Sequence, residues 1–314
     1  MKTARHVAVG LAIIGMLAVS TSRASDQGWA PLPDETAGVL LVTGADKGYL
    51  EPLPCLRDIG GALYRPGFNE WLAAQAPGLE WAWASTGHVL SKPDPDYSAA
   101  EPERMLAQLA ETGYAFVGAS TMDAEVIGLE GITEWSRRGV PFYSSNMKVF
   151  ETGKPALPGH HVLELGGTRL GLVSVTAEDP GWIGIGPDGG TVLVEDARAA
   201  VSRALDEVRG AADRTVLLAN GLSHTELRAL LREIDPPDLV VGQSAAFFVK
   251  QPRPIGDVPV LWIGRFGQVL GRVSVSAGGE ILEVRGMQVG DRFPIEPLTG
   301  RPSAPPEERV SSVD

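Results

Sequence analysis

Apolar and polar residues alternate along the chain in blocks that have either strand or helix periodicity. Short apolar runs bounded by turn residues predict buried strands. These runs are Gly38–Thr43, Glu80–Ser85, Ala115–Gly118, Pro141–Asn146, Arg169–Val175, Thr215–Asn220, Asp238–Gly242 and Pro259–Gly264. Apolar residues at helical spacing occur in Glu101–Thr112, Glu195–Arg209 and Ser223–Ile234. Strands that alternate with helices predict an α/β fold with largely parallel sheet.

Local turn and cap signals refine this outline. Gly166-Gly167 and Gly278-Gly279 each separate two apolar runs, which is typical of tight β-hairpins. Ser223 is followed three positions later by Glu226, the spacing of a capping box. We therefore expect antiparallel hairpins within the parallel sheet, and a helix that begins beside Ser223.

The first 24 residues have the composition of a cleavable export signal. They begin with basic residues, continue with the apolar run Val7–Val19, and end in small residues before the Ala24-Ser25 bond. This order is that of a secretory signal peptide, and its apolar run is too short to span a bilayer. We therefore expect a periplasmic or secreted protein, cleaved near Ala24-Ser25.

The rest of the chain predicts one domain, residues 25–297, because no internal repeat or linker-like segment interrupts it. Residues 298–314 are rich in Pro, Ser and Glu, lack apolar periodicity, and are expected to be a disordered tail. Cys55 is the sole cysteine, which excludes an internal disulfide and a cysteine-based metal cluster. Its thiol either pairs with a partner protein or is simply buried.

Acidic residues outnumber basic ones, and the formal net charge of the full chain is -12. The signal peptide carries three basic and no acidic residues, so its removal leaves -15. This charge argues against nucleic acid and anionic lipid as partners. No later apolar segment is long enough to span a membrane. The partners that remain are an unknown small ligand or a periplasmic protein.

Several local patterns follow one another in an order that one enzyme family shares. The first strand ends in the turn GADKGYLEP, and similar strand-to-loop patterns recur along the chain. The segments are Leu41–Pro52, Ala84–His88, Gly113–Gly118, Phe142–Met147, Leu217–Gly221 and Leu239–Ala245. Together they resemble the amino-terminal catalytic domain of periplasmic 5′-nucleotidases, in the calcineurin-like metallophosphoesterase superfamily. The resemblance spans residues 38–288 and implies a four-layer αββα sandwich with two mixed β-sheets.

The resemblance also implies where two divalent metal ions would bind, and this chain departs from the family at each such position. The family's first-loop Asp-x-His falls on Ala45 and Lys47, and its bridging Asp falls on His88. The Asn-His and Ser-His pairs fall on Ala119-Ser120 and Ala219-Asn220, and the last two histidines fall on Gln243 and Ala245. We therefore expect no metal cofactor. The expected vestigial cleft comprises Ala45, Asp46, Lys47, His88, Ala119, Ser120, Asn220, Gln243 and Ala245.

His88 and Asp46 are the weak candidates for catalysis. His88 follows Gly87 at a strand end, where it is either a remnant ligand or general base, or an ordinary polar loop residue. If the alignment with the family's first motif is shifted by one residue, Asp46 falls on a ligand position. No such shift places a metal ligand in the other loops. His160 and His161 are adjacent in an expected strand, so they point to opposite faces and do not share a metal.

The loop Thr176–Gly186 is a candidate contact surface, because apolar residues in a polar loop mark exposed contacts. Asp179 and Trp182 are its candidate residues, with Ile183 and Ile185 beside them. Its Gly and Pro content is typical of a lid or rim, although turn chemistry alone accounts for Asp179.

Three hypotheses for function follow. The first is an exported, non-catalytic binding or interaction protein that keeps a phosphoesterase fold and has lost the two-metal site. The second is an active phosphoester or related ester hydrolase with an atypical site, holding one metal ion or none, that uses His88 and Asp46. The third is a partner subunit of a periplasmic assembly, held through the Trp182 loop or Cys55. The resemblance ends before the family's second, nucleobase-binding domain, so it does not imply nucleotide specificity.

Overall fold

The computed structural model describes residues 31–51, 60–92, 102–177, 181, 183–243 and 250–288. The described residues from Leu32 onward belong to one compact unit. The expected signal peptide, Cys55 and the tail after residue 297 lie outside the described residues. Within the described part, no helix is long and apolar enough to cross a membrane.

The first sheet has six strands in the order β15-β14-β1-β2-β3-β4. Strands β1 to β4 run parallel, whereas β14 is antiparallel to both β1 and β15. Their bounds are Thr36–Thr43 (β1), Glu80–Ser85 (β2), Tyr114–Gly118 (β3), Phe142–Tyr143 (β4), Val269–Ser276 (β14) and Ile281–Gln288 (β15). The expected β14–β15 hairpin is therefore confirmed.

The second sheet also has six strands, in the order β12-β13-β11-β10-β7-β6. Its four central strands are parallel, and an antiparallel strand closes each edge. The bounds are His160–Leu165 (β6), Thr168–Thr176 (β7), Arg214–Asn220 (β10), Leu239–Gln243 (β11), Arg253–Ile255 (β12) and Val258–Ile263 (β13). The hairpin expected at Gly166-Gly167 is the β6–β7 pair.

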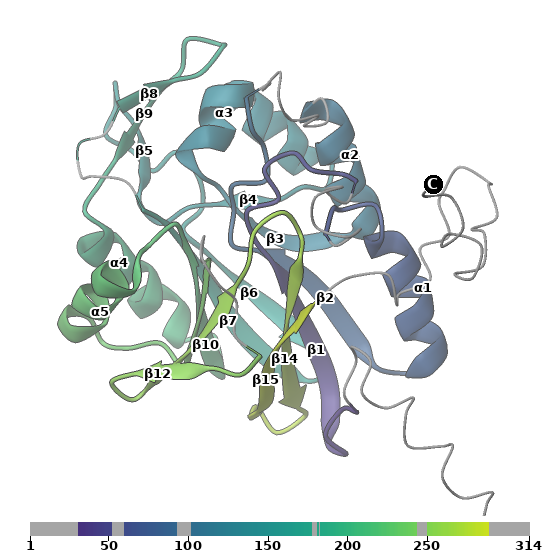
Figure 1. The fold of residues 1–314 in the computed structure, drawn as a ribbon. Helices are drawn as coiled ribbons and strands as arrows, with labels where there is room; N and C mark the ends of the chain where they lie inside the picture. The colour runs from purple at the N-terminus through teal and green to yellow at the C-terminus, as the bar shows by residue number, and fades with distance from the viewer. Residues whose placement is uncertain are drawn as a thin grey trace, which may run out of the picture. The chain divides into compact units, whose positions relative to one another are not determined.

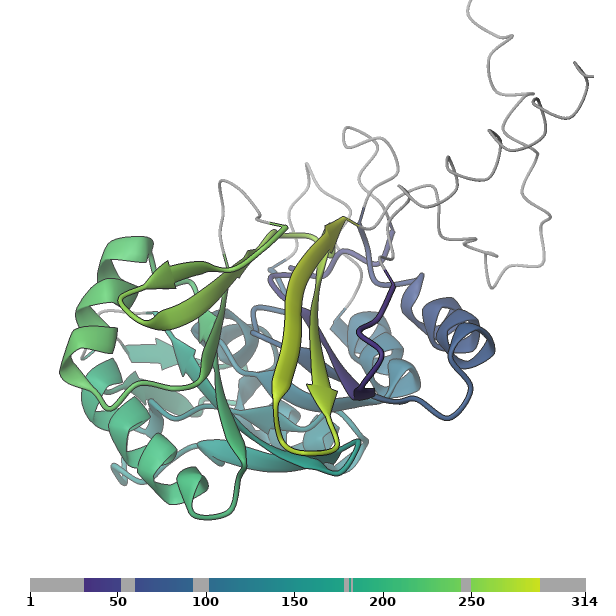
Figure 2. The same ribbon diagram turned by 90° about the horizontal axis from the view of Figure 1, so that it is seen from below.

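Helices cover the outer faces of the two sheets. Helices α1 (Arg65–Gln75), α2 (Pro102–Thr112) and α3 (Thr121–Arg137) lie beside the first sheet, and α4 (Ala197–Arg209) and α5 (His224–Glu233) beside the second. Figure 2 shows α1 and the α4–α5 pair on opposite sides of the strands. Apolar side chains of both sheets form one buried cluster between them. The predicted αββα sandwich with two mixed sheets is confirmed.

Two features differ from the expected elements. The strand expected over Pro141–Asn146 shrinks to two residues, because Ser144 and Ser145 donate their backbone N–H groups to Pro158 and Ser174 instead. A third, small sheet was not expected. It joins β5 (Met147–Val149), β9 (Thr191–Val194) and β8 (Ile183–Ile185), and lies beside α3 (Figure 1).

Candidate functional site

The loops that follow β1, β2, β3, β10 and β11 meet at one edge of the two sheets. A β-carbon on Gly87 would lie only 2.5 Å from the carbonyl oxygen of Gly118 and 2.9 Å from Asn220 Nδ2. Thr86 Oγ1 lies 3.5 Å from Gln243 Oε1, to which it donates. Loops from the first sheet therefore contact loops from the second. In α/β proteins, sites form at the carboxyl ends of parallel strands, so this edge is the candidate site.

Asp46, in the loop after β1, forms a fully buried ion pair with Arg65, in the first turn of α1. Arg65 Nη2 donates to Asp46 Oδ1, and neither side chain has exposed surface. The guanidinium also lies 5.8 and 5.7 Å from the ring centroids of Tyr64 and Tyr114. Burial alone would lower the pKa of Arg65, but the Asp46 carboxylate keeps that pKa above its ordinary value. The Asp46 carboxylate is therefore engaged inside the protein.

Lys47 and His88 are the partly exposed polar groups of these loops. The Lys47 backbone N–H donates to the His88 carbonyl over 3.0 Å, and Lys47 Nζ lies 5.9 Å from the centre of the Phe266 ring. Burial, and secondly the charge of Arg265, lower the pKa of Lys47. Burial, and secondly the charge of Lys47, lower the pKa of His88 to about 4. At neutral pH the site therefore presents a half-buried ammonium beside a neutral imidazole.

The backbone of this edge is strained. Among the described residues, positive φ outside glycine occurs at Ala45 (46°), Lys47 (53°), His88 (58°) and Phe266 (60°). The Ala45 N–H donates to the Gly87 carbonyl over 3.0 Å, and the Phe266 N–H donates to the Ala45 carbonyl over 2.8 Å. The four residues thus belong to one hydrogen-bonded group of loops. Left-handed conformations outside glycine cost about 1 to 3 kcal/mol each and cluster at functional sites.

Ala119 and Ser120, at the end of β3, have structural contacts. Ala119 is fully buried and donates its N–H to the Tyr143 carbonyl over 2.8 Å. Ser120 caps α3 in a reciprocal capping box with Asp123. Asp123 is also buried and accepts a hydrogen bond from Leu90 N over 2.8 Å, and burial raises its pKa to about 6. Asp123 therefore joins the loop after β2 to the start of α3.

The remaining histidines of the described chain lie apart. His160 Nδ1 is 3.4 Å from Glu207, whereas His161 packs against Tyr143, so the two adjacent histidines point to different partners as expected. His224 is the first residue of α5 and directly follows the N-cap Ser223. The expected capping box of Ser223 and Glu226 is confirmed. Within the described residues, no group of three or more His, Cys, Asp or Glu could hold a metal ion.

The donors at this edge do not fit a two-metal centre. Two divalent cations side by side need several anionic oxygens, including a bridging carboxylate, together with neutral imidazoles. The described loops offer one imidazole, one ammonium and the amides of Asn220 and Gln243. The two carboxylates at this edge are engaged, Asp46 with Arg65 and Asp123 with Ser120 and the Leu90 N–H. Ala245 lies outside the described residues.

The structure adds residues that sequence patterns did not indicate. Arg65 is one, because its partner Asp46 lies 19 positions away in the sequence and no local pattern joins them. Arg265 and Phe266, in the turn between β13 and β14, are the others. No local pattern marks them, because their left-handed turn and their approach to Lys47 depend on a strand distant in sequence.

The expected contact loop is partly an edge strand. Asp179 and Trp182 lie outside the described residues, but Ile183 and Ile185 form the outer strand of the small sheet. Their exposed fractions are 48% and 67%, so these apolar side chains do face solvent as the pattern indicated.

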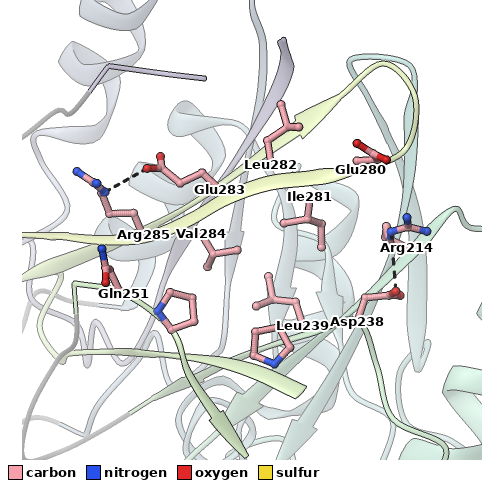
Figure 3. Close-up of a pocket in the computed structure, with 12 residues that line it drawn as sticks. Arg214, Asp238, Leu239, Gln251, Glu280, Ile281, Leu282, Glu283, Val284 and Arg285 are labelled. Atoms are coloured by element: carbon pink, nitrogen blue, oxygen red, sulfur yellow. Dashed lines mark ion pairs between the residues drawn. The ribbon is translucent and has the colours of Figure 1, made fainter. Parts of the chain in front are cut away.

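A groove of about 720 Å³ lies between β15 and the amino ends of β10 and β11 (Figure 3). The side chains of Ile281, Val284 and Leu239 lie between two ion pairs, Glu283–Arg285 and Arg214–Asp238. All four charges are thus engaged in ion pairs, and Glu283 also pairs with Arg272. The groove is distant from the carboxyl-end loops.

Several solved structures share this arrangement. A 5′-nucleotidase precursor from Thermus thermophilus matches with a TM-score of 0.62 and 18% identity, over 80% of this chain and 54% of that one. The sulfate thiohydrolase SoxB of Thermus thermophilus matches with 0.63 and 17%, over 83% and 58%. The chain has the metallophosphoesterase fold. A calcineurin-like phosphoesterase from Bacillus subtilis, YfkN, also matches, with 0.55 and 13%, over 80% and 90%.

These similarities show the metallophosphoesterase fold but do not assign an activity, because one fold can host different chemistries. The chain spans little more than half the length of the two Thermus proteins. No protein-family model and no curated protein sequence matches the chain.

Proposed function

We propose that this chain is an exported binding or interaction protein that keeps the metallophosphoesterase fold without forming its two-metal centre. The observation that carries the proposal is the buried Asp46–Arg65 ion pair. An internal guanidinium compensates the first-loop carboxylate, so this loop needs no divalent cation to balance its charge. The expected signal peptide supports export to the periplasm or beyond.

The other loops support the same conclusion through their chemistry. Lys47 brings a positive charge to the edge where a dication would have to bind, and like charges repel. Ser120 and Asp123 are already engaged in capping α3 and in holding the loop after β2. Metal-assisted hydrolysis requires a bound Lewis acid or a metal-activated water, and the described side chains at this edge offer few ligands that would hold a cation.

Hydrolysis assays on the purified mature protein test this proposal. Phosphate monoesters and diesters are offered with Mn²⁺ or Zn²⁺, and in parallel with EDTA. We expect that turnover with added metal does not exceed background and does not differ from turnover with EDTA. Hydrolysis that needs a metal, and that His88→Ala removes, would contradict the proposal and favour the atypical hydrolase.

A further inference from the structure

We infer that the edge formed by Lys47, His88 and the Phe266 turn binds a small oxyanion directly, without metal. The ligand class is a phosphate, sulfate or carboxylate group, held by the Lys47 ammonium and by neutral hydrogen-bond donors around it. This inference rests on the proposed absence of the two-metal centre and extends it, because it assigns a ligand to the same loops.

The first support is an uncompensated cation. Lys92 and Lys148 form ion pairs with glutamates, whereas Lys47, Lys154 and Lys250 have no described carboxylate within ion-pair distance. Of these three lysines, Lys154 and Lys250 are exposed and Lys47 is partly buried. The nearest acid in sequence, Asp46, is bound to Arg65. Burial and the charge of Arg265 lower the pKa of Lys47, as expected for an ammonium in a positive local potential. A bound anion would compensate this charge on a protein that is acidic as a whole.

The second support is the set of neutral polar groups beside this cation. The Lys47 charge acts on the half-buried imidazole of His88, which is neutral at physiological pH and therefore keeps one N–H donor. The Asn220 amide lies against Gly87, and the Gln243 amide lies next to Thr86. Amide and imidazole N–H groups donate to oxyanions without adding a carboxylate that would repel them.

The third support is the backbone strain at Lys47 and His88, where a glycine would be less strained. Lys47 and His88 both have left-handed backbones, a conformation that glycine adopts without cost. Neighbouring positions of the same edge, Gly48 and Gly87, are glycines with positive φ. Strained backbone of this kind clusters at ligand-binding sites, and at this edge it holds the two polar residues Lys47 and His88 together with Ala45 and Phe266.

Calorimetric titration of the mature protein in EDTA tests the inference, with inorganic phosphate, sulfate and acetate as probes. We expect saturable binding of at least one probe, and the preferred probe separates tetrahedral from planar oxyanions. Lys47→Met should weaken that binding at least tenfold, because a charge-assisted hydrogen bond is lost. Lys154→Met removes the same charge from an exposed loop and should leave affinity unchanged.

A second variant separates a binding defect from misfolding. Lys47→Gly removes the ammonium and also relieves the left-handed strain, so it should melt at a higher temperature than the wild type and still lose the anion. Absence of saturable binding, or equal weakening by Lys47→Met and Lys154→Met, would overturn the inference and leave the proposed function intact. Binding that appears only with Mn²⁺ or Zn²⁺ would overturn both.

Discussion

At the scale of single residues, the Asp46–Arg65 pair decides how this edge can be used. Both side chains are fully buried, and Arg65 Nε and Nη1 and Asp46 Oδ2 have no hydrogen-bond partner among the described residues. Such a pair is costly to break, because removal of one partner leaves an uncompensated charge in the interior. Asp46 and Arg65 therefore act as one unit that holds the loop after β1 against α1.

Removal of the Arg65 charge should destabilise the fold strongly. We expect Arg65→Met to lower the free energy of unfolding by about 3 to 5 kcal/mol, with part of the loss recovered in the Asp46→Asn/Arg65→Met double variant. Urea unfolding measures both. Arg228→Met, on the exposed face of α5, is the matched control and should change stability by about 0.5 kcal/mol at most. Equal effects of the two single variants would contradict a buried pair.

His88 should titrate far below the ordinary pKa of histidine. Its pKa of about 4 arises from burial and from the Lys47 charge, so Lys47→Met should raise it without restoring 6.5. NMR titration of the imidazole measures both values. An unshifted pKa near 6.5 in the wild type would mean that the ring is solvated.

The lowered pKa of His88 also makes the stability of the fold depend on pH. Between pH 6.5 and about 4 the unfolded state binds the His88 proton and the folded state does not, so this contribution to stability is lost as pH falls. The raised pKa of Asp123, about 6, acts in the opposite direction over an overlapping range. The comparison of wild type with His88→Gln by urea unfolding at pH 7 and pH 4.5 isolates the histidine term. Between pH 7 and pH 4.5, the free energy of unfolding should fall more for the wild type than for His88→Gln.

The sequence could indicate which loops meet at this edge, but not how their charges are satisfied. The order of strand ends placed Asp46, His88, Asn220 and Gln243 near one another, and the structure brings their loops together. The partner of Asp46 lies 19 positions away on a helix with little apolar periodicity. Long-range pairing of this kind leaves no local pattern.

At the scale of elements, α3 shows how the small third sheet is held in place. The helix has a kink at Gly128, where φ is 72°. Asp188, in the turn between β8 and β9, accepts from the backbone N–H of Glu130 over 2.9 Å and so caps the second half of α3. The hairpin that carries Ile183 and Ile185 is therefore docked on the helix by a cap from another element.

Loss of this cap should cost about 0.5 to 2 kcal/mol in Asp188→Ala, and little in Asp188→Asn, which keeps an acceptor oxygen. Gly128→Ala should be worse, because its β-carbon would lie 2.3 Å from the Asp188 carboxylate. Gly210→Ala, with φ of -65° and open space around it, is the control. Unfolding free energies measure all four. A neutral Gly128→Ala would contradict the docked geometry.

Elements with strong periodicity followed the sequence, and weakly periodic ones did not. The parallel strands β1, β2, β7 and β10 agree with the apolar runs to within two residues at each end. Strands of three or four residues, as in the small sheet, are too short to show a period. Helix α1 begins with Arg65-Pro66-Gly67, whose glycine is a poor helix former, so the sequence did not reveal it.

At the scale of the whole molecule, the two sheets pack on each other through aliphatic side chains and need no ion between them. The buried cluster joins Leu40 and Val42 of β1 to Val173 and Val216 of the second sheet. At the carboxyl edge, internal groups such as Arg65 and Asp123 hold the loops. The fold should therefore be independent of divalent metal.

Chelation should leave thermal stability unchanged. A tightly bound ion at 100 times its dissociation constant stabilises a protein by about 2.7 kcal/mol, which is several degrees in melting temperature for a domain of this size. We expect the melting curves with Mn²⁺, with Zn²⁺ and with EDTA to agree within about 1 °C. Protection by a metal that EDTA reverses would show that the loops bind it.

The most direct test of the central claim is the metal content of the purified mature protein. The protein is incubated with manganese and zinc, freed of unbound ions by gel filtration, and analysed by mass spectrometry of the elements. Our account predicts a folded protein with far less than one ion per chain. Close to two ions per chain, lost on His88→Ala, would contradict it and show that these loops still form the metal centre.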